Sequence, residues 1–100
     1  MIQEATAIAS IQPKSEYYDA CKQALLELQK PTLKELGCLQ FDIFESENNN
    51  GKIYLFERFE NEESRNLHLT YDYTKKVIAA YNDWLAEDIQ VVIMMDGSVR

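Results

Sequence analysis

The sequence predicts a small α+β domain with the element order β-α-β-β-α-β, which pairs with a second copy of itself. A length of 100 residues fits one domain, spanning 1–100 with a core of about 2–95. Strand-like runs with a two-residue period are separated by stretches with helical periodicity. Two helices can cover one face of a four-stranded sheet, and these strands carry apolar residues on both faces. We therefore expect a homodimer that buries the second face.

Composition makes several classes of partner and binding site unlikely. The net charge of −7 and the scattered basic residues disfavour nucleic acid and anionic membrane surfaces. The longest apolar run, Val91 to Met95, is too short to span a bilayer, and the first residues lack a signal peptide's basic cluster, so a cytoplasmic protein is expected. Cys21, Cys38 and a single histidine do not form a zinc-binding pattern, and both cysteines are expected to be reduced.

The first half of the chain predicts a strand and a helix. The strand is expected over Ile2 to Ile11, which is rich in small and β-branched residues and closes at Pro13. Ser15 is expected to cap the following helix, and Pro31 to interrupt it.

A short turn and a hairpin are expected next. Thr32 and Glu35 have the spacing of a capping box for one further helical turn, which Gly37 ends. An Asn-rich turn ending in Gly then joins strands over Cys38 to Glu45 and Lys52 to Phe59. Alternation places Leu39, Phe41 and Ile43 on one face of the first strand. In the second strand, Ile53, Leu55, Glu57 and Phe59 share one face. The opposite face receives Tyr54, Phe56 and Arg58.

Two further helical stretches and a last strand complete the expected order. Asn61 is expected to cap a helix from Glu62 to about Leu69, and Asp72 to cap another. The second of these carries one apolar stripe, formed by Val77, Ala80, Tyr81, Trp84 and Leu85. The last strand is expected over Ile89 to Met95, again apolar on both faces.

Several segments, in order, resemble the antibiotic biosynthesis monooxygenase family. They are Pro31 to Asp42, Tyr54 to Phe59, Asn61-Glu62-Glu63 and His68-Leu69, and their order and spacing match over about Ala5 to Met94. The resemblance implies a ferredoxin-like antiparallel sheet paired across a two-fold axis, the dimeric α+β barrel. It also implies oxidation of phenolic or quinol-type rings by molecular oxygen without flavin, haem or metal, and hence no cofactor.

This chain departs from the pattern of many family members at two positions. Phe59 stands where many members have tryptophan in the third strand, and Tyr73 stands where many have a second histidine. The loss of one imidazole weakens any mechanism that needs two, although a tyrosine hydroxyl can still donate or accept a proton. Family relatives of the same size isomerise a phosphorylated sugar, so the fold carries the reaction class only by analogy.

The candidate catalytic residues are His68, Glu57 and Tyr73. His68 can take a proton from a phenol or quinol, or can simply bond a backbone carbonyl at a helix end. Glu57 lies mid-strand among apolar residues, where a carboxylate must be paired, hydrated or protonated. It can orient His68 or pair with an arginine across the dimer.

The candidate substrate-binding residues are mostly aromatic. Tyr71 and Tyr73 flank the break between helices near His68, and Tyr54 and Phe59 add to an aromatic lining suited to a planar organic substrate. Arg58 can anchor an acidic substrate or pair with an acid at the dimer interface, and the sequence does not separate these roles.

Three functions follow from these residues. The first is a cofactor-independent monooxygenase acting on a small aromatic or quinol-like compound, with His68 as the base. The second is an isomerase or lyase acting on a small polar metabolite, with His68 and a carboxylate moving a proton. The third is a dimeric domain that binds a small molecule without catalysis.

Overall fold

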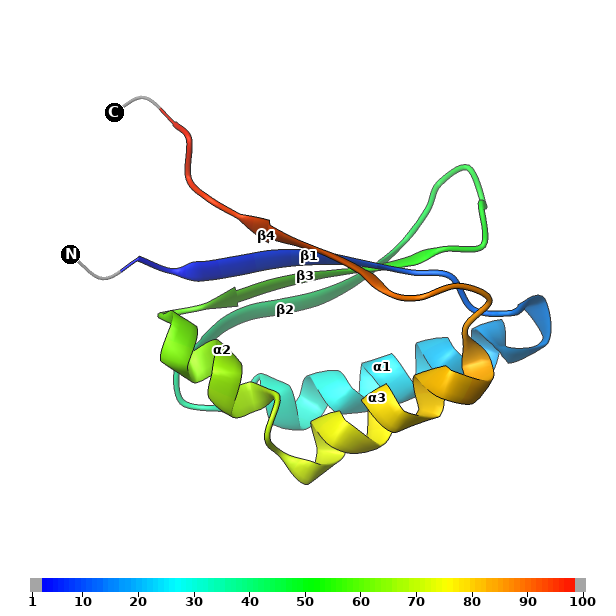
Figure 1. Cartoon of the computed structure of the whole chain (residues 1–100), viewed down its shortest axis with the longest axis horizontal. Helices are drawn as coiled ribbons and strands as arrows, with labels where there is room; N and C mark the ends of the chain where they lie inside the picture. Colours follow the sequence, from blue (N-terminus) through cyan, green and yellow to red (C-terminus); the bar gives the residue numbers. More distant parts are fainter. Residues whose placement is uncertain (1–2, 99–100) are drawn as a thin grey trace.

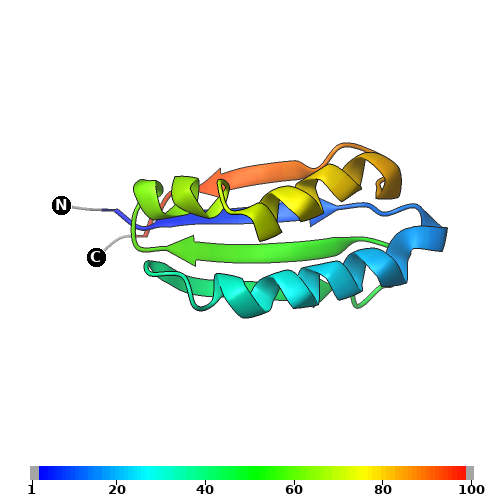
Figure 2. The ribbon, with the colours of Figure 1, turned by 90° about the horizontal axis from the view of Figure 1, so that it is seen from below.

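Residues 3–98, which are those the structure describes, form a four-stranded antiparallel sheet with helices on one face (Figure 1). The structure is a computed structural model. Seen from the helical side, α1 and α3 run side by side across the sheet (Figure 2). The elements in chain order are β1 (Ala5–Ile11), the short 3-10 turn η1 (Ser15–Tyr17), α1 (Tyr18–Thr32), β2 (Cys38–Glu45), β3 (Ile53–Phe59), α2 (Glu62–His68), α3 (Asp72–Trp84) and β4 (Gln90–Met94).

The strand order β2-β3-β1-β4 confirms the expected ferredoxin-like α+β fold. β1 lies between β3 and β4 and is antiparallel to both, while β2 pairs with β3 through the hairpin. No helix within residues 3–98 combines the length and the apolar character needed to cross a membrane.

One face of the sheet, here called the inner face, carries the core. Small and branched residues of β1 and β3 pack there against one stripe of α1, and burial of this apolar area is the main stabilising term. The buried core residues are Ala7, Ala9, Ile11, Cys21, Leu25, Leu28, Phe41, Ile53, Leu55 and Phe59.

The other face, here called the outer face, faces away from all the helices and carries apolar side chains among polar ones. The register places Ile8 beside Phe56 on one side and beside Val92 on the other. Phe44 and Val92, at 52% and 57% exposure, are among its most exposed apolar side chains. The expectation of strands that are apolar on both sides is thus confirmed.

The end of α1 differs from the expectation. Pro31 does not interrupt the helix but lies in its last turn, and α1 continues to Thr32. Thr32 and Glu35 do not form a capping box, since the Thr32 hydroxyl donates to the Leu28 carbonyl at 2.7 Å. Ser15 does not cap α1 either, because η1 precedes the helix and its cap makes no side-chain hydrogen bond.

The starts of the later helices are closer to the expectation. Asn61 caps α2 as expected, and its side-chain oxygen accepts the Ser64 N–H at 2.8 Å. Asp72 is the first residue of α3 and not its cap, a position that Tyr71 takes without a side-chain hydrogen bond. The helix starts one residue earlier than expected because Tyr71 has the extended backbone conformation of a cap residue.

The strands carry one further correction. A register irregularity between Cys38 and Gln40 interrupts the pairing of β2 with β3. Leu39 falls in this bulge and is 46% exposed, so it does not share the buried face with Phe41. β1 begins at Ala5, and Ile2, the expected first residue, lies outside the described residues.

Candidate functional site

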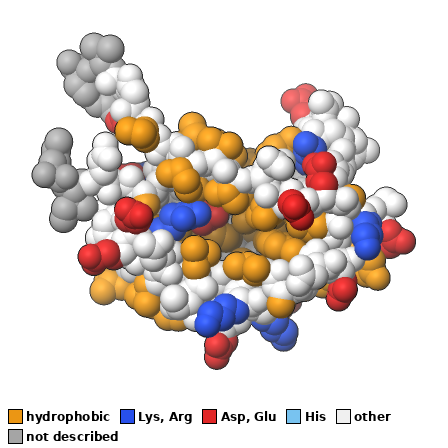
Figure 3. All heavy atoms as spheres, in the orientation of Figure 1, with side chains coloured by type: hydrophobic (Ala, Val, Ile, Leu, Met, Phe, Trp, Pro, Cys, Tyr) orange, Lys and Arg blue, Asp and Glu red, His pale blue; other side chains and the backbone are white. Residues whose placement is uncertain are grey.

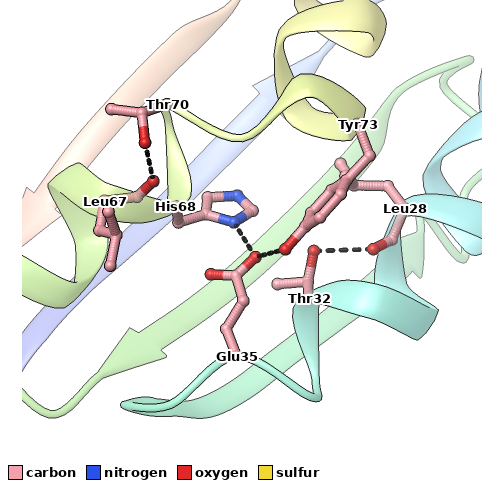
Figure 4. A network of polar contacts seen from close by, with 7 residues as sticks. All are labelled: Leu28, Thr32, Glu35, Leu67, His68, Thr70 and Tyr73. Carbon is pink, nitrogen blue, oxygen red and sulfur yellow. Dashed lines mark hydrogen bonds and ion pairs between the residues drawn. The ribbon is translucent and has the colours of Figure 1, made fainter.

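His68 is the last residue of α2 and is buried between that helix and the sheet. Its side chain is 3% exposed, and its Nδ1 lies 2.9 Å from Oε2 of Glu35, whose side chain is 6% exposed. Glu35 follows α1 in the turn that leads to β2, so two segments 33 residues apart meet here (Figure 4).

Tyr73, in the first turn of α3, bonds to the same carboxylate. Its hydroxyl donates to Oε2 of Glu35, so one oxygen of Glu35 lies between the imidazole and the phenol (Figure 4). Burial and this hydrogen bond raise the pKa of Tyr73 above its ordinary value of 10.0. Tyr73 therefore stays protonated and acts as a donor that holds the Glu35 carboxylate in place.

The contact to Glu35 defines what the imidazole can do. A carboxylate accepts hydrogen bonds, so Nδ1 of a neutral His68 carries the proton and Nε2 keeps its lone pair. Figure 4 shows Nε2 on the side of the ring away from Glu35. A proton taken up at Nε2 would make an imidazolium whose charge Glu35 offsets, which is the arrangement of a general base with an orienting acid.

Aromatic rings surround the imidazole. The centroids of Phe59 and Phe41 lie 5.3 Å and 5.7 Å from that of His68. Tyr71 stacks on Tyr73 at 5.4 Å between centroids, at the break between α2 and α3. Phe41 and Phe59 are buried and pack the imidazole in place, while the partly exposed Tyr71 and Tyr73 supply apolar surface near the base.

Glu57 is the second acid on the inner face. It stands between Ala7 and Phe41 in the sheet and is 8% exposed. Burial raises its pKa above the ordinary 4.5, and the positive charges of Arg65 and of His68 when protonated act in the opposite direction. A carboxyl that holds its proton more tightly can serve as a donor near the base.

The space-filling view shows a hollow between the sheet and the helices (Figure 3). Hydrophobic side chains line its floor, and basic and acidic side chains gather at its left-hand end, where α2 passes below the sheet. The inner-face residues of β1 at this end are alanines, Ala5 and Ala7, whose small side chains leave room there.

The structure brings five of the seven candidate residues together. His68, Tyr73, Tyr71, Phe59 and Glu57 all lie on the helical side of the sheet around the imidazole.

Tyr54 and Arg58 lie on the outer face, away from this group. The Tyr54 hydroxyl accepts from Asn50 at 3.2 Å. Arg58 donates to Glu4 at 2.9 Å and to Gln40 at 3.1 Å.

Two residues of the site were missed in the sequence. The spacing of Glu35 from Thr32 predicts a helix cap, and no local pattern links Glu35 to a histidine 33 residues later. Glu35, and not Glu57, is the acid hydrogen-bonded to His68. Arg65 could have been found, since it precedes His68 by three residues and so shares its side of α2.

A second pocket, of about 350 Å³, lies near the opposite end of the sheet. Its titratable side chain is Tyr18, whose hydroxyl donates to Glu45 at 2.7 Å and whose pKa burial raises to about 12. It offers no base at neutral pH. Within residues 3–98 there is also no group of three or more His, Cys, Asp or Glu placed to hold a metal ion.

One family model and a set of solved structures are similar to this chain. The model of the family "Antibiotic biosynthesis monooxygenase" matches residues 5–80. Rv0793 from Mycobacterium tuberculosis is similar at 23% identity and a TM-score of 0.91, over 97% of this chain and 98% of that one. PA3566 from Pseudomonas aeruginosa is similar at 19% identity and a TM-score of 0.89, over 98% of both chains.

A protein from Nitrosomonas europaea that is named for the same family is similar at 21% identity and a TM-score of 0.88. The likeness covers 94% of this chain and 90% of that one. No match was found among curated proteins. At these identities the solved structures support the fold, and the family model supports kinship.

Proposed function

This chain belongs to the antibiotic biosynthesis monooxygenase family, and on that premise we propose that it oxidises a small aromatic or quinol-like compound with molecular oxygen, without a bound cofactor. The observation that carries the proposal is the buried His68–Glu35 pair, whose free Nε2 lies among aromatic rings. A base in an apolar, aromatic setting suits a flat substrate with an acidic hydroxyl.

In the proposed reaction His68 acts first. Nε2 takes the proton of the substrate hydroxyl, and Glu35 stabilises the imidazolium through Nδ1. The electron-rich anion passes one electron to oxygen, and the radical and superoxide combine at a ring carbon that bears hydrogen. The proton held on His68 returns to the peroxide, and loss of water leaves one oxygen atom on the ring as a carbonyl.

The other residues have supporting roles in this proposal. Tyr71 provides apolar surface for the ring and Phe59 packs against the imidazole. Tyr73 holds Glu35, and Glu57, whose pKa is raised by burial, is a proton donor beside the base. The protein acts as a cytoplasmic homodimer whose outer faces pack together, since exposed apolar surface of this kind is typical of an interface.

A proton-shuttling isomerase or lyase is the second candidate. It is favoured by Glu57, a buried acid whose raised pKa and electrostatic coupling to His68 pair a proton donor with a base. Such an enzyme would act on a small polar metabolite and consume no oxygen.

Oxygen uptake with a panel of hydroquinones tests the proposal. We expect uptake by the native protein and a loss of about 10²–10⁴-fold in kcat for His68→Gln, since that is the usual contribution of a general base. Conversion of a substrate without oxygen uptake would favour the isomerase. Binding of rings without any turnover would leave a binding domain.

Glu35→Gln tests the orienting acid. The amide can no longer stabilise the imidazolium, so we expect kcat to fall by about 10²-fold and the pH profile of kcat/KM to shift. The ring-nitrogen NMR signals of His68 report the tautomer directly and should change. Glu63→Gln, at an exposed position of α2, is the matched control. An unchanged pH profile and tautomer in Glu35→Gln would contradict the role.

A further inference from the structure

Arg65 has a buried donor that lacks an acceptor. Its Nε is shielded from solvent and has no hydrogen-bond partner among residues 3–98. Leaving a charged donor buried and unpaired is costly, and native proteins seldom do so without a ligand, water or ion to complete it. Arg65 lies one helical turn before His68 in α2, on the same side of that helix.

Glu57, whose pKa responds to the charge of Arg65, does not satisfy this donor. The charge of Arg65 is felt by Glu57 and lowers its pKa, but burial outweighs this influence. Within the described part of the chain the two side chains form neither an ion pair nor a hydrogen bond, whereas Arg58 on the outer face is bonded to both Glu4 and Gln40. Arg65 is therefore not a structural arginine of the kind that Arg58 is.

A second buried polar atom without a hydrogen-bond partner lies nine residues further along the chain. The hydroxyl of Thr74, a residue that is 2% exposed, has no partner among residues 3–98. Thr74 follows Tyr73 in the first turn of α3, so unpaired polar atoms occur in both helices that flank His68. The hollow between sheet and helices carries charged side chains at its α2 end (Figure 3).

We propose that Arg65 binds an acidic group of the substrate, so that the preferred ligand is a small hydroxylated aromatic ring carrying a carboxylate. The two terminal nitrogens of a guanidinium form a fork of N–H donors that matches a carboxylate. Those of Arg65, a partly exposed residue, are not shut off from solvent as its Nε is. Side chains three residues apart on a helix stand about 5–6 Å apart at Cβ, comparable with the span of a substituted benzene ring. Arg65 then holds the carboxylate while His68 faces the hydroxyl.

This inference rests on the proposed function for the choice of an aromatic ring, but its test does not require turnover. Three probes of equal ring size serve: a dihydroxybenzoate, the matching dihydroxybenzamide and hydroquinone. Their affinities are measured by calorimetry without oxygen. We expect the native protein to bind the carboxylate at least about 10-fold more tightly than the neutral amide, as a charge-assisted hydrogen bond to a partly shielded guanidinium implies.

Variants identify the residue responsible. Arg65→Gln should lose the preference for the carboxylate while still binding hydroquinone, and Arg65→Lys should retain part of it because the charge remains. Lys76→Gln, with the same charge change at an exposed position of α3, is the control and should keep the full preference. Thermal unfolding of each variant checks that it is folded, and Arg65→Lys serves if Arg65→Gln is not.

A direct readout completes the experiment. The Nε–H proton of Arg65 is shielded from solvent, so its NMR signal should be observable, and it should shift with the dihydroxybenzoate and not with the amide. Equal affinity of the native protein for the two, an unchanged preference in Arg65→Gln, or no binding of any ring would overturn the inference. Oxidation of neutral hydroquinone with no carboxylate preference would refute it and leave the proposed function standing. Carboxylate-selective binding without oxygen uptake would support the role of Arg65 and refute the proposed oxidation.

Discussion

His68 and Glu57 are both buried on the helical side of the sheet, but the residues around them affect a charge on each side chain differently. The imidazole has a carboxylate at 2.9 Å that offsets a positive charge. The carboxyl of Glu57 has no hydrogen bond within the described residues, and burial raises its pKa above 4.5. A positive charge is thus easier to place in this site than a second negative one.

The raised pKa of Glu57 predicts how stability depends on pH. The folded state holds this proton more tightly than the unfolded chain does, so Glu57 adds no penalty below its ordinary pKa of 4.5. As pH rises through the higher folded-state pKa, the penalty of ionising a buried carboxyl develops and stability is lost. Glu57→Gln cannot ionise and should avoid this loss.

Urea unfolding at several pH values measures the difference between Glu57→Gln and the native protein. The difference in unfolding free energy should move in favour of the variant as pH rises above 4.5. Burying the amide of the variant can also change its stability, but that change does not vary with pH, so the pH dependence isolates the ionisation of Glu57. Glu63→Gln, at an exposed site, should follow the native pH dependence. A pH-independent difference for Glu57→Gln would contradict the account.

The turn between α1 and β2 is the element that positions Glu35. Gly37 ends it with a φ of +94°, a conformation that favours glycine, and its carbonyl accepts the Glu60 N–H at 2.7 Å. A Cβ at this residue would lie 2.8 Å from Cβ of Ser64, in the first turn of α2. The close approach fixes this turn against the helix that carries His68.

Gly37→Ala should therefore destabilise the protein. The positive φ and the collision with Ser64 together predict a loss of about 1–3 kcal/mol in unfolding free energy. Gly97→Ala is the control, because a Cβ there meets nothing within 4 Å. Equal unfolding free energies for the two variants in urea would show that the turn can accept a Cβ without loss of stability, and would contradict this prediction.

At the scale of the whole molecule, one apolar face of the sheet remains without a cover. Val92 and Met94 of β4 stand on it at 57% and 41% exposure, and Val92 pairs with Ile8 of β1. Exposed apolar area of this kind is uncommon on a monomer. We expect a second copy to cover it.

Val92→Arg should disrupt that pairing. Sedimentation should give the native protein twice the chain mass of 11.6 kDa, and the variant 11.6 kDa at the same concentration. Ile78→Arg places the same change on the helical side, at a residue 47% exposed, and should leave the dimer intact. A native species of 11.6 kDa would remove the dimer from the proposal.

Most of the fold could be predicted from the local periodicity of apolar residues. Alternation in β3 separated Glu57 and Phe59 from Tyr54 and Arg58, and the structure places them on opposite faces as that alternation requires. The candidate site residues nevertheless include members of both faces, and this alternation is the reason why Tyr54 and Arg58 lie away from His68. It failed at Leu39, because a bulge is set by pairing with the neighbouring strand and leaves no mark on the residue pattern of its own strand.

The sequence by itself determined the element order, the two apolar faces of the sheet and the place of His68 at the end of a helix, because these depend on short-range periodicity and capping. Only the tertiary structure decided that Glu35 holds His68 and that Arg65 is left without a partner. Those facts depend on how a turn after α1 packs against α2, which brings together residues 33 positions apart. Such contacts follow from the packing of whole elements, and no local pattern encodes them.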